Sequence, residues 1–199
     1  MATGIEMPTP GFWERYLMAM DKLTDRLNRI TGALTKMNVP HALVGGQAVI
    51  LWVSTKDPAA VRTTKDVDIL LNRADLPKAK RAALSIGLDY FEVVDVGMFL
   101  EQSDPNPRHG VHLIWAGEKV KAECPLPSPT IDERIELEPG KFVVTLPGLL
   151  LMKLMANRDH DRVHLRDMID VGLIERSMLD GLPAELAGRL DALLNEAGR

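Results

Sequence analysis

The sequence has almost no cysteine and no excess of positive charge. Cys124 is the single cysteine among 199 residues, so no internal disulfide can form and a reducing cytoplasm is the expected compartment. The formal net charge is −4, whereas broad affinity for nucleic acid needs a basic surface. Nucleic-acid binding therefore stays open only for a local basic patch.

Long apolar runs are also lacking. The opening segment MATGIEMPTPG has neither a basic leader nor an apolar core of signal-peptide length. No uninterrupted apolar run approaches the roughly 20 residues of a membrane span, so we expect no membrane partner. What remains is 46% apolar and 26% charged residues, an ordinary globular balance for one domain with, at most, a helical appendage.

Hydrophobic periodicity predicts a small α/β (α+β) protein. Apolar residues recur every three or four positions from about Phe12 to Met37, which indicates an amphipathic helix that ends before Pro40. The next predicted elements are a strand at 41–44, a turn at Gly45-Gly46, a helix at 47–53, a strand at 66–71, a helix at 74–87, strands at 90–96 and 110–117, and a hairpin of 134–138 with 141–145. From Leu146 the pattern is helical, with breaks near 157–159, 172 and 181. We expect three parts: a tail and helix (1–38), a mixed-sheet core (39–145) and a helical region (146–199).

Two aspartates lie one residue apart in the predicted strand DVDILL. Side chains alternate along a strand, so Asp66 and Asp68 point the same way, with Cα atoms about 6.5 Å apart. Carboxylates at that spacing can converge on one Mg²⁺, or on two ions about 3.5–4 Å apart as in two-metal phosphoryl transfer. Solvation at a sheet edge would also tolerate this pair with no ligand.

The glycine pair is the second feature that suggests chemistry. Gly45 and Gly46 allow a positive φ and a close approach of a ligand to the backbone. A helix that begins at Gly46 or Gln47 offers unpaired N–H groups to an anion such as a triphosphate. A tight strand-to-helix turn alone would explain two glycines. The combination with two carboxylates on the following strand favours a nucleotide held together with a divalent metal.

The segments LVGGQAV and RTTKDVDILL resemble the nucleotidyltransferase fold of the DNA polymerase β superfamily. The group they resemble most is that of AbiEii-type toxins and related minimal nucleotidyltransferases, in which an Arg-x-Thr often precedes the acidic pair, as Arg62 and Thr64 do here. The segment LLLMKLMANRDHDRVHLRDM resembles that group more loosely. The resemblance implies that Arg62, Thr64, Lys153, Arg158 and Asp161 lie near the nucleotide.

The family usually carries a third carboxylate on a neighbouring strand, as metal ligand and as base for the attacking hydroxyl. The corresponding strand here is GVHLIWAGEKV, where His112 stands at the position of the expected aspartate. Histidine can act as base or ligand because its pKa lies near neutrality. His112 equally fits a protein that has lost the chemistry, and Glu118 is the fallback carboxylate.

The arginines of the last segment have two interpretations. Arg158, Arg162 and Arg166 recur every four residues among aspartates, which is typical of a solvated helix face with ion pairs. Alternatively, Lys153 and one of these arginines neutralise triphosphate charge.

The resulting hypothesis is an enzyme, a nucleotidyltransferase that uses Mg²⁺ or Mn²⁺ and moves an NMP group from an NTP to a hydroxyl. The acceptor is a protein side chain, a tRNA end or a small molecule such as an aminoglycoside. A toxin–antitoxin role would add an antitoxin-type protein partner. In this hypothesis Gly45, Gly46 and Gln47 bind phosphates, Asp66 and Asp68 hold the metal, and His112 completes the catalytic group. The alternative is a catalytically degenerate nucleotide-binding or protein-interaction module of the same fold.

Overall fold

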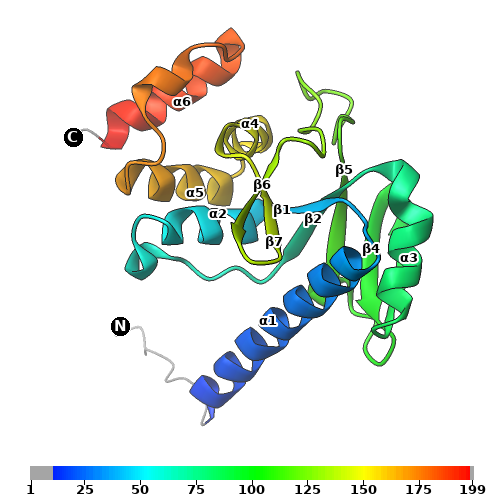
Figure 1. Cartoon of the computed structure of the whole chain (residues 1–199). Coiled ribbons are helices and arrows are strands. Elements are labelled where there is room, and N and C mark those ends of the chain that lie inside the picture. The colour runs from blue at the N-terminus through cyan, green and yellow to red at the C-terminus, as the bar shows by residue number, and fades with distance from the viewer. Residues whose placement is uncertain (1–10, 198–199) are drawn as a thin grey trace, which may run out of the picture.

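The computed structural model describes residues 11–197, so most of the predicted N-terminal tail lies outside the described residues. Within them, one seven-stranded sheet in the order β3-β4-β5-β2-β1-β7-β6 is flanked by six α-helices (Figure 1). The strands are β1 (His41–Val44), β2 (Val67–Leu71), β3 (Leu88–Val93), β4 (Val96–Glu101), β5 (Val111–Trp115), β6 (Arg134–Glu138) and β7 (Lys141–Val144). The helices are α1 (Phe12–Lys36), α2 (Gly45–Ser54), α3 (Leu76–Leu84), α4 (Leu146–Ala156), α5 (Asp159–Asp170) and α6 (Ala184–Ala197). The predicted α/β class is confirmed.

The sheet is mixed, and its centre brings together the strands that carry the motifs. Strand β1 runs antiparallel to β2 and parallel to β7, and β2 runs parallel to β5. The two outer hairpins, β3–β4 and β6–β7, are antiparallel. Because β1 and β2 run in opposite directions, the end of β1 lies beside the start of β2.

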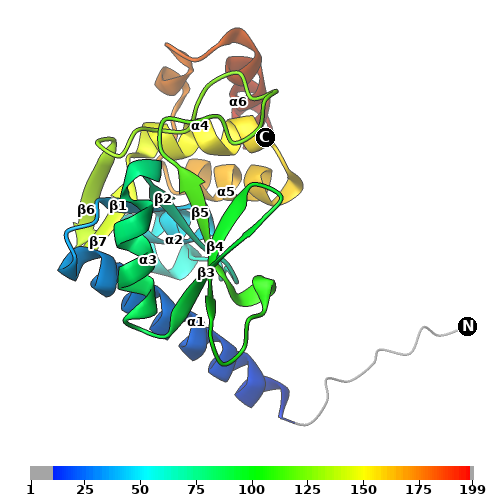
Figure 2. The same ribbon diagram turned by 90° about the vertical axis from the view of Figure 1, so that its right-hand side faces the viewer.

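Alternation along the central strands divides the core between the two faces of the sheet. One face contributes Leu43, Ile69 and Leu113 to a cluster with α1 and α3. The other contributes Val44 and Leu70 to a cluster with α2, α4, α5 and α6. Figures 1 and 2 show these two groups of helices on opposite sides of the sheet. The site described below belongs to the side of α2.

The strand predicted at 90–96 is wrong, because this segment turns back on itself. It forms the end of β3 and the start of β4, joined at Val94 and Asp95, which have φ of 50° and 63°. Two-residue hairpin turns need positive φ, and their usual sequence signal is Asn-Gly or Asp-Gly. Val94-Asp95 carries no such signal, and the residues around it are β-branched and aromatic. The sequence pattern therefore predicted one strand across the turn.

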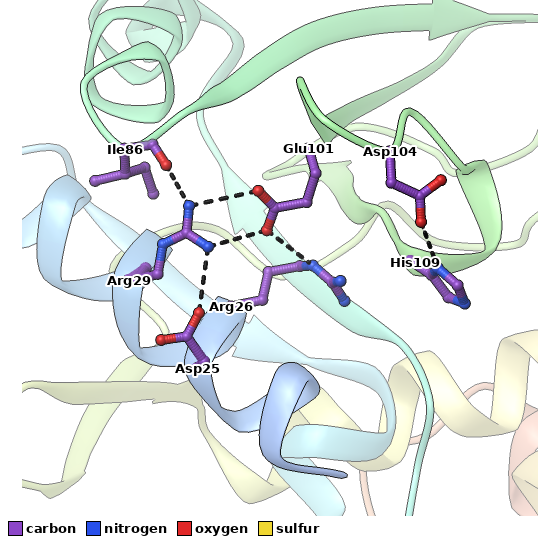
Figure 3. A network of polar contacts seen from close by, with 7 residues as sticks. All are labelled: Asp25, Arg26, Arg29, Ile86, Glu101, Asp104 and His109. Carbon is purple, nitrogen blue, oxygen red and sulfur yellow. Dashed lines mark hydrogen bonds and ion pairs between the residues drawn. The ribbon is translucent and has the colours of Figure 1, made fainter. Parts of the chain in front are cut away.

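Helix α1 is fastened to the sheet by arginines on its second half (Figure 3). Arg29 donates through Nη1 to Glu101 at the end of β4, at 3.0 Å, and through Nη2 to the carbonyl of Ile86. Arg26 lies 3.6 Å from the same carboxylate. Glu101 therefore joins α1 to the outer hairpin, while the first half of the helix extends away from the sheet (Figure 1).

No helix within residues 11–197 is both long enough and apolar enough to cross a bilayer.

Candidate functional site

The glycine pair lies where β1 passes into α2, and both glycines are required by what packs on them. Gly45 has φ +63°, and a Cβ built there would lie 2.1 Å from Oδ2 of Asp68. A Cβ on Gly46 would lie 2.5 Å from Oγ1 of Thr64. Such separations are far inside van der Waals contact. The carboxylate of Asp68 and the hydroxyl of Thr64 thus lie directly against the backbone at the start of α2.

The first turn of α2 has N–H groups to offer. Val44 precedes the helix in an extended conformation, and no side chain caps its first turn. The first N–H groups of any helix lack partners within that helix and carry the positive end of its dipole. Gln47, in the same turn, is buried. The turn is therefore the positive end of a helix, half-buried at Gly45 and buried at Gly46 and Gln47, with a carboxylate packed against it.

Strand register brings Asp68 and His112 side by side. Asp68 pairs with Val44 on β1 and with His112 on β5. Alternation puts Asp68 on the same face as Leu70, which packs against α2 and its neighbours. Oδ1 of Asp68 lies 3.6 Å from Nδ1 of His112, and each side chain is about a quarter exposed (25% and 26%). Strand β2 begins at Val67, so Asp66, predicted as a strand residue, stands exposed just before it.

The pKa of His112 is raised, chiefly because its ring nitrogen faces the carboxylate of Asp68. Partial burial opposes this shift, and the charges of Asp68 and Asp66 add to it. Asp66 is therefore close enough for its negative charge to stabilise the protonated imidazole of His112. Two carboxylates and one histidine therefore form one electrostatic group at the start of β2 and β5.

The acidic pair suits a magnesium ion only in part. Mg²⁺ takes oxygen ligands and is commonly bound through one or two carboxylates together with substrate phosphates. Asp68, packed against the start of α2, offers one such carboxylate, and Asp66 precedes it by two residues. No three His, Cys, Asp or Glu side chains of residues 11–197 are grouped so as to hold a metal by themselves. A bound metal would thus take its remaining ligands from a nucleotide and water.

Glu118 is not placed to be the third carboxylate. The parallel register aligns Asp68 with His112 at the start of the strands and Leu71 with Trp115 at their end. Glu118 follows Trp115, beyond the opposite end of β5, and there it pairs with Arg73 at 2.7 Å. The fallback assignment is therefore wrong on geometry.

Lys153 and Arg158 both bond to the buried Asp161 between α4 and α5, Lys153 from the interior and Arg158 from the surface, where its side chain is 65% exposed. Lys153 is only 5% exposed, and its Nζ donates to Oδ1 of Asp161 at 2.8 Å and contacts Nδ1 of His164 at 2.9 Å. Arg158 donates through Nε to Oδ2 of the same aspartate at 2.7 Å. Burial and the charge of Lys153 lower the pKa of His164 to about 4. Within residues 11–197, neither cation forms a hydrogen bond or ion pair with Gly45, Gly46 or Asp68.

Arg62 is bound by a residue that the sequence alone did not single out. Its Nε donates to both oxygens of Asp167 on α5, at 2.9 and 2.7 Å. The alternating charges of α5 were expected to pair within that helix. A carboxylate that pairs across 105 positions leaves no local signal in the sequence.

Comparisons with known proteins return structures and nothing else: no family model and no curated protein matches. The chain is similar to a crystal structure of ANT(2″)-Ia in complex with adenylyl-2″-tobramycin, with TM-score 0.46, 14% identity, and coverage of 90% of this chain and 99% of that one. It is also similar to a solution structure of the antibiotic-resistance factor ANT(2″)-Ia, with TM-score 0.43, 12% identity, and coverage of 92% and 91%. What the site can do has to be judged from its own residues.

Proposed function

We propose that this chain is a nucleotidyltransferase that moves a nucleoside monophosphate from a nucleoside triphosphate to a hydroxyl group. The supporting observation is the contact between Gly45 and Asp68. It sets a carboxylate directly beside uncapped helix amides. Phosphate oxygens bound by those amides would meet a divalent cation held by the carboxylate. The acceptor is a protein side chain, a tRNA end or a small molecule.

Each residue of the site has a role in this proposal. The amides of Gly45, Gly46 and Gln47 bind the β- and γ-phosphates, and the hydroxyl of Thr64, packed against Gly46, donates to the same oxygens. Asp66 and Asp68 hold Mg²⁺ or Mn²⁺, which when bound neutralises charge on the phosphates. Lys153 acts only through its charge, since its buried ammonium is bonded to Asp161. Arg158 bonds the same aspartate through Nε alone, and its exposed Nη groups stay available to phosphate oxygens.

The reaction is an in-line displacement. The acceptor oxygen forms a bond to the α-phosphorus while the bond from that phosphorus to the bridging oxygen breaks, and pyrophosphate leaves with the electron pair. The acceptor's proton needs a base. His112 can accept it only when neutral, and the neighbouring carboxylates, by raising its pKa, make that form scarcer near neutral pH.

Calorimetric titration tests the nucleotide site. Mg-ATP, Mg-GTP, Mg-CTP and Mg-UTP are titrated in turn, and we expect at least one to bind. Asp68→Asn should bind that nucleotide at least tenfold more weakly, because a metal ligand is neutralised. Asp21→Asn is the matched control, an exposed aspartate on α1. No metal-dependent binding to the wild type would defeat the proposal.

A second function of a different class is favoured by one observation: a histidine, whose pKa is raised, stands where the third carboxylate is expected. The chain would then bind nucleotide without transferring it. Incubation with α-³²P-labelled NTPs and a cell extract separates the two functions. Label transfer by the wild type, lost in His112→Ala, supports the enzyme. Transfer that appears only in His112→Asp supports the degenerate module.

The finer assignment, to AbiEii-type toxins with an antitoxin-type partner, is supported only by the resembling segments 39–71 and 149–169. Expression of the wild-type chain in a bacterial host is then expected to slow growth, and expression of Asp68→Asn is not. Equal growth with both chains, at equal protein level, would remove the toxin assignment and leave the transferase proposal standing.

A further inference from the structure

Arg62 is held at one end of its guanidinium and free at the other. Nε donates to both oxygens of Asp167, whose side chain is only 10% exposed, whereas that of Arg62 is 64% exposed. An arginine carries four further N–H groups on its two Nη atoms. Within the described residues, nothing accepts a hydrogen bond from either of them. The ion pair therefore leaves the part of arginine that best binds phosphate unoccupied.

The place of Arg62 in the chain sets it near the glycine turn. It lies two residues before Thr64, and two residues of extended chain span at most about 7 Å. Thr64 packs its hydroxyl against Gly46. Asp167 belongs to α5, which packs against α2, the helix that begins at those glycines. Both ends of the ion pair are thus attached to elements that form the site.

A purely structural role predicts something different. A surface ion pair is worth little in stability, on average no more than about 1 kcal/mol, and the pair could simply fasten the loop 55–66 to α5. Such fastening needs only the bonds to the carboxylate and makes no use of the two amino groups. The observed bonds to Asp167 use Nε alone and leave both amino groups unbonded within the described residues, and a nearly buried carboxylate fixes the side chain that would otherwise be free to move.

We propose that Asp167 is a positioning residue, which holds Arg62 so that its two amino groups receive the triphosphate bound at the start of α2. This inference rests on the proposed transferase function and adds a residue to it. Asp167 itself does not contact the nucleotide. Its removal should weaken binding of the phosphates by freeing Arg62, not by removing a contact.

The test is a double-mutant cycle with Mg²⁺ and inorganic tripolyphosphate, a probe that does not depend on which base is preferred. We expect Arg62→Ala and Asp167→Ala each to weaken binding by about tenfold, the usual effect of one charge-assisted contact. The double variant should be no weaker than Arg62→Ala, because Asp167 acts only through Arg62. Asp167→Asn, which keeps one oxygen for Nε, should recover part of the affinity.

The matched control is Asp191→Ala, which breaks another arginine–aspartate pair, with Arg176, between the segment before α6 and α6 itself. It should leave the affinity within twofold while lowering the melting temperature about as much as Asp167→Ala does. If Asp167→Ala lowers only the melting temperature, or if the two losses add in the double variant, the positioning role is refuted. If the wild type fails to bind tripolyphosphate at all, the proposed function itself fails, which is a separate outcome.

Discussion

At the scale of single residues, the site depends on two positions where any side chain would collide with another part of it. Gly45 combines a positive φ with a carboxylate at 2.1 Å from its missing Cβ. The sequence predicted the need for a bare backbone here, and the structure identifies what needs the space. The glycines make room for Asp68 and Thr64 before any ligand is considered.

Gly45→Ala should therefore do more damage than backbone strain alone. Gly140 is a matched control, since its φ is +74° and nothing lies within 4 Å of its missing Cβ. We expect Gly140→Ala to cost about 1 kcal/mol in the free energy of unfolding, the ordinary penalty for a left-handed residue, and to leave nucleotide affinity unchanged. Gly45→Ala should cost more and abolish Mg-NTP binding, because Asp68 must move. Denaturant titration and calorimetry on both variants measure this, and equal behaviour of the two would contradict it.

A second residue-scale prediction concerns pH. Burial lowers the pKa of His41 and of His164, the latter to about 4, so between pH 6.5 and 4 these two imidazoles bind more protons in the unfolded chain than in the folded one. The stability they contribute is therefore lost as the pH falls through this range. His164→Gln should remove its part of the decline, about 1–2 kcal/mol once solvent screening is allowed for. Thermal unfolding at pH 7, 5.5 and 4 tests this. Parallel pH curves for variant and wild type would show that the His164 network does not titrate as described.

At the scale of elements, the register of β2 with β5 decides which residue is the neighbour of Asp68. Hydrophobic periodicity can place a strand, but it cannot say which strand lies beside it or at what offset. The sequence therefore left His112 and Glu118 both open as replacements for the third carboxylate. The parallel pairing aligns His112 with Asp68 and carries Glu118 past the far end of the sheet.

Glu118→Gln should accordingly leave nucleotide affinity and transfer unchanged within twofold. Its pair with Arg73 is half exposed, so its loss should lower stability by at most about 1 kcal/mol. Calorimetry with Mg-NTP and label transfer are the measurements. A tenfold loss in either would mean that the strand register, or the place of the metal, differs from that described here.

Most elements were predictable because their periodicity is long or their boundaries are marked. The first helix ends before Pro40, and the C-terminal breaks coincide with Asn157, Gly172 and Gly181, all of which have positive φ. The exception is the β3–β4 hairpin, whose turn residues Val94 and Asp95 belong to an unbroken β-like pattern. Likewise, the bonds of Lys153 and Arg62 join different elements, and such pairing is set by packing of the whole chain.

At the scale of the whole molecule, helices cover both faces of one sheet, and the candidate site lies on the face that packs against α2. The cluster that packs α2, α4, α5 and α6 together holds the first turn of α2 in place. Leu165 is fully buried in it. Leu165→Ala should cost about 2–5 kcal/mol in the free energy of unfolding, because a cavity is left behind. Denaturant titration measures this, and a cost below 1 kcal/mol would mean that α5 is not packed as described.

The central claim is that phosphates bind the start of α2 next to Asp68, and backbone amide shifts test it most directly. Mg-NTP added to isotope-labelled protein should move the N–H signals of Gly45, Gly46 and Gln47, and the same nucleotide without metal should move them much less. Asp68→Asn should abolish the metal-dependent part. Shifts clustered on another surface, with these three amides unmoved, would contradict the account.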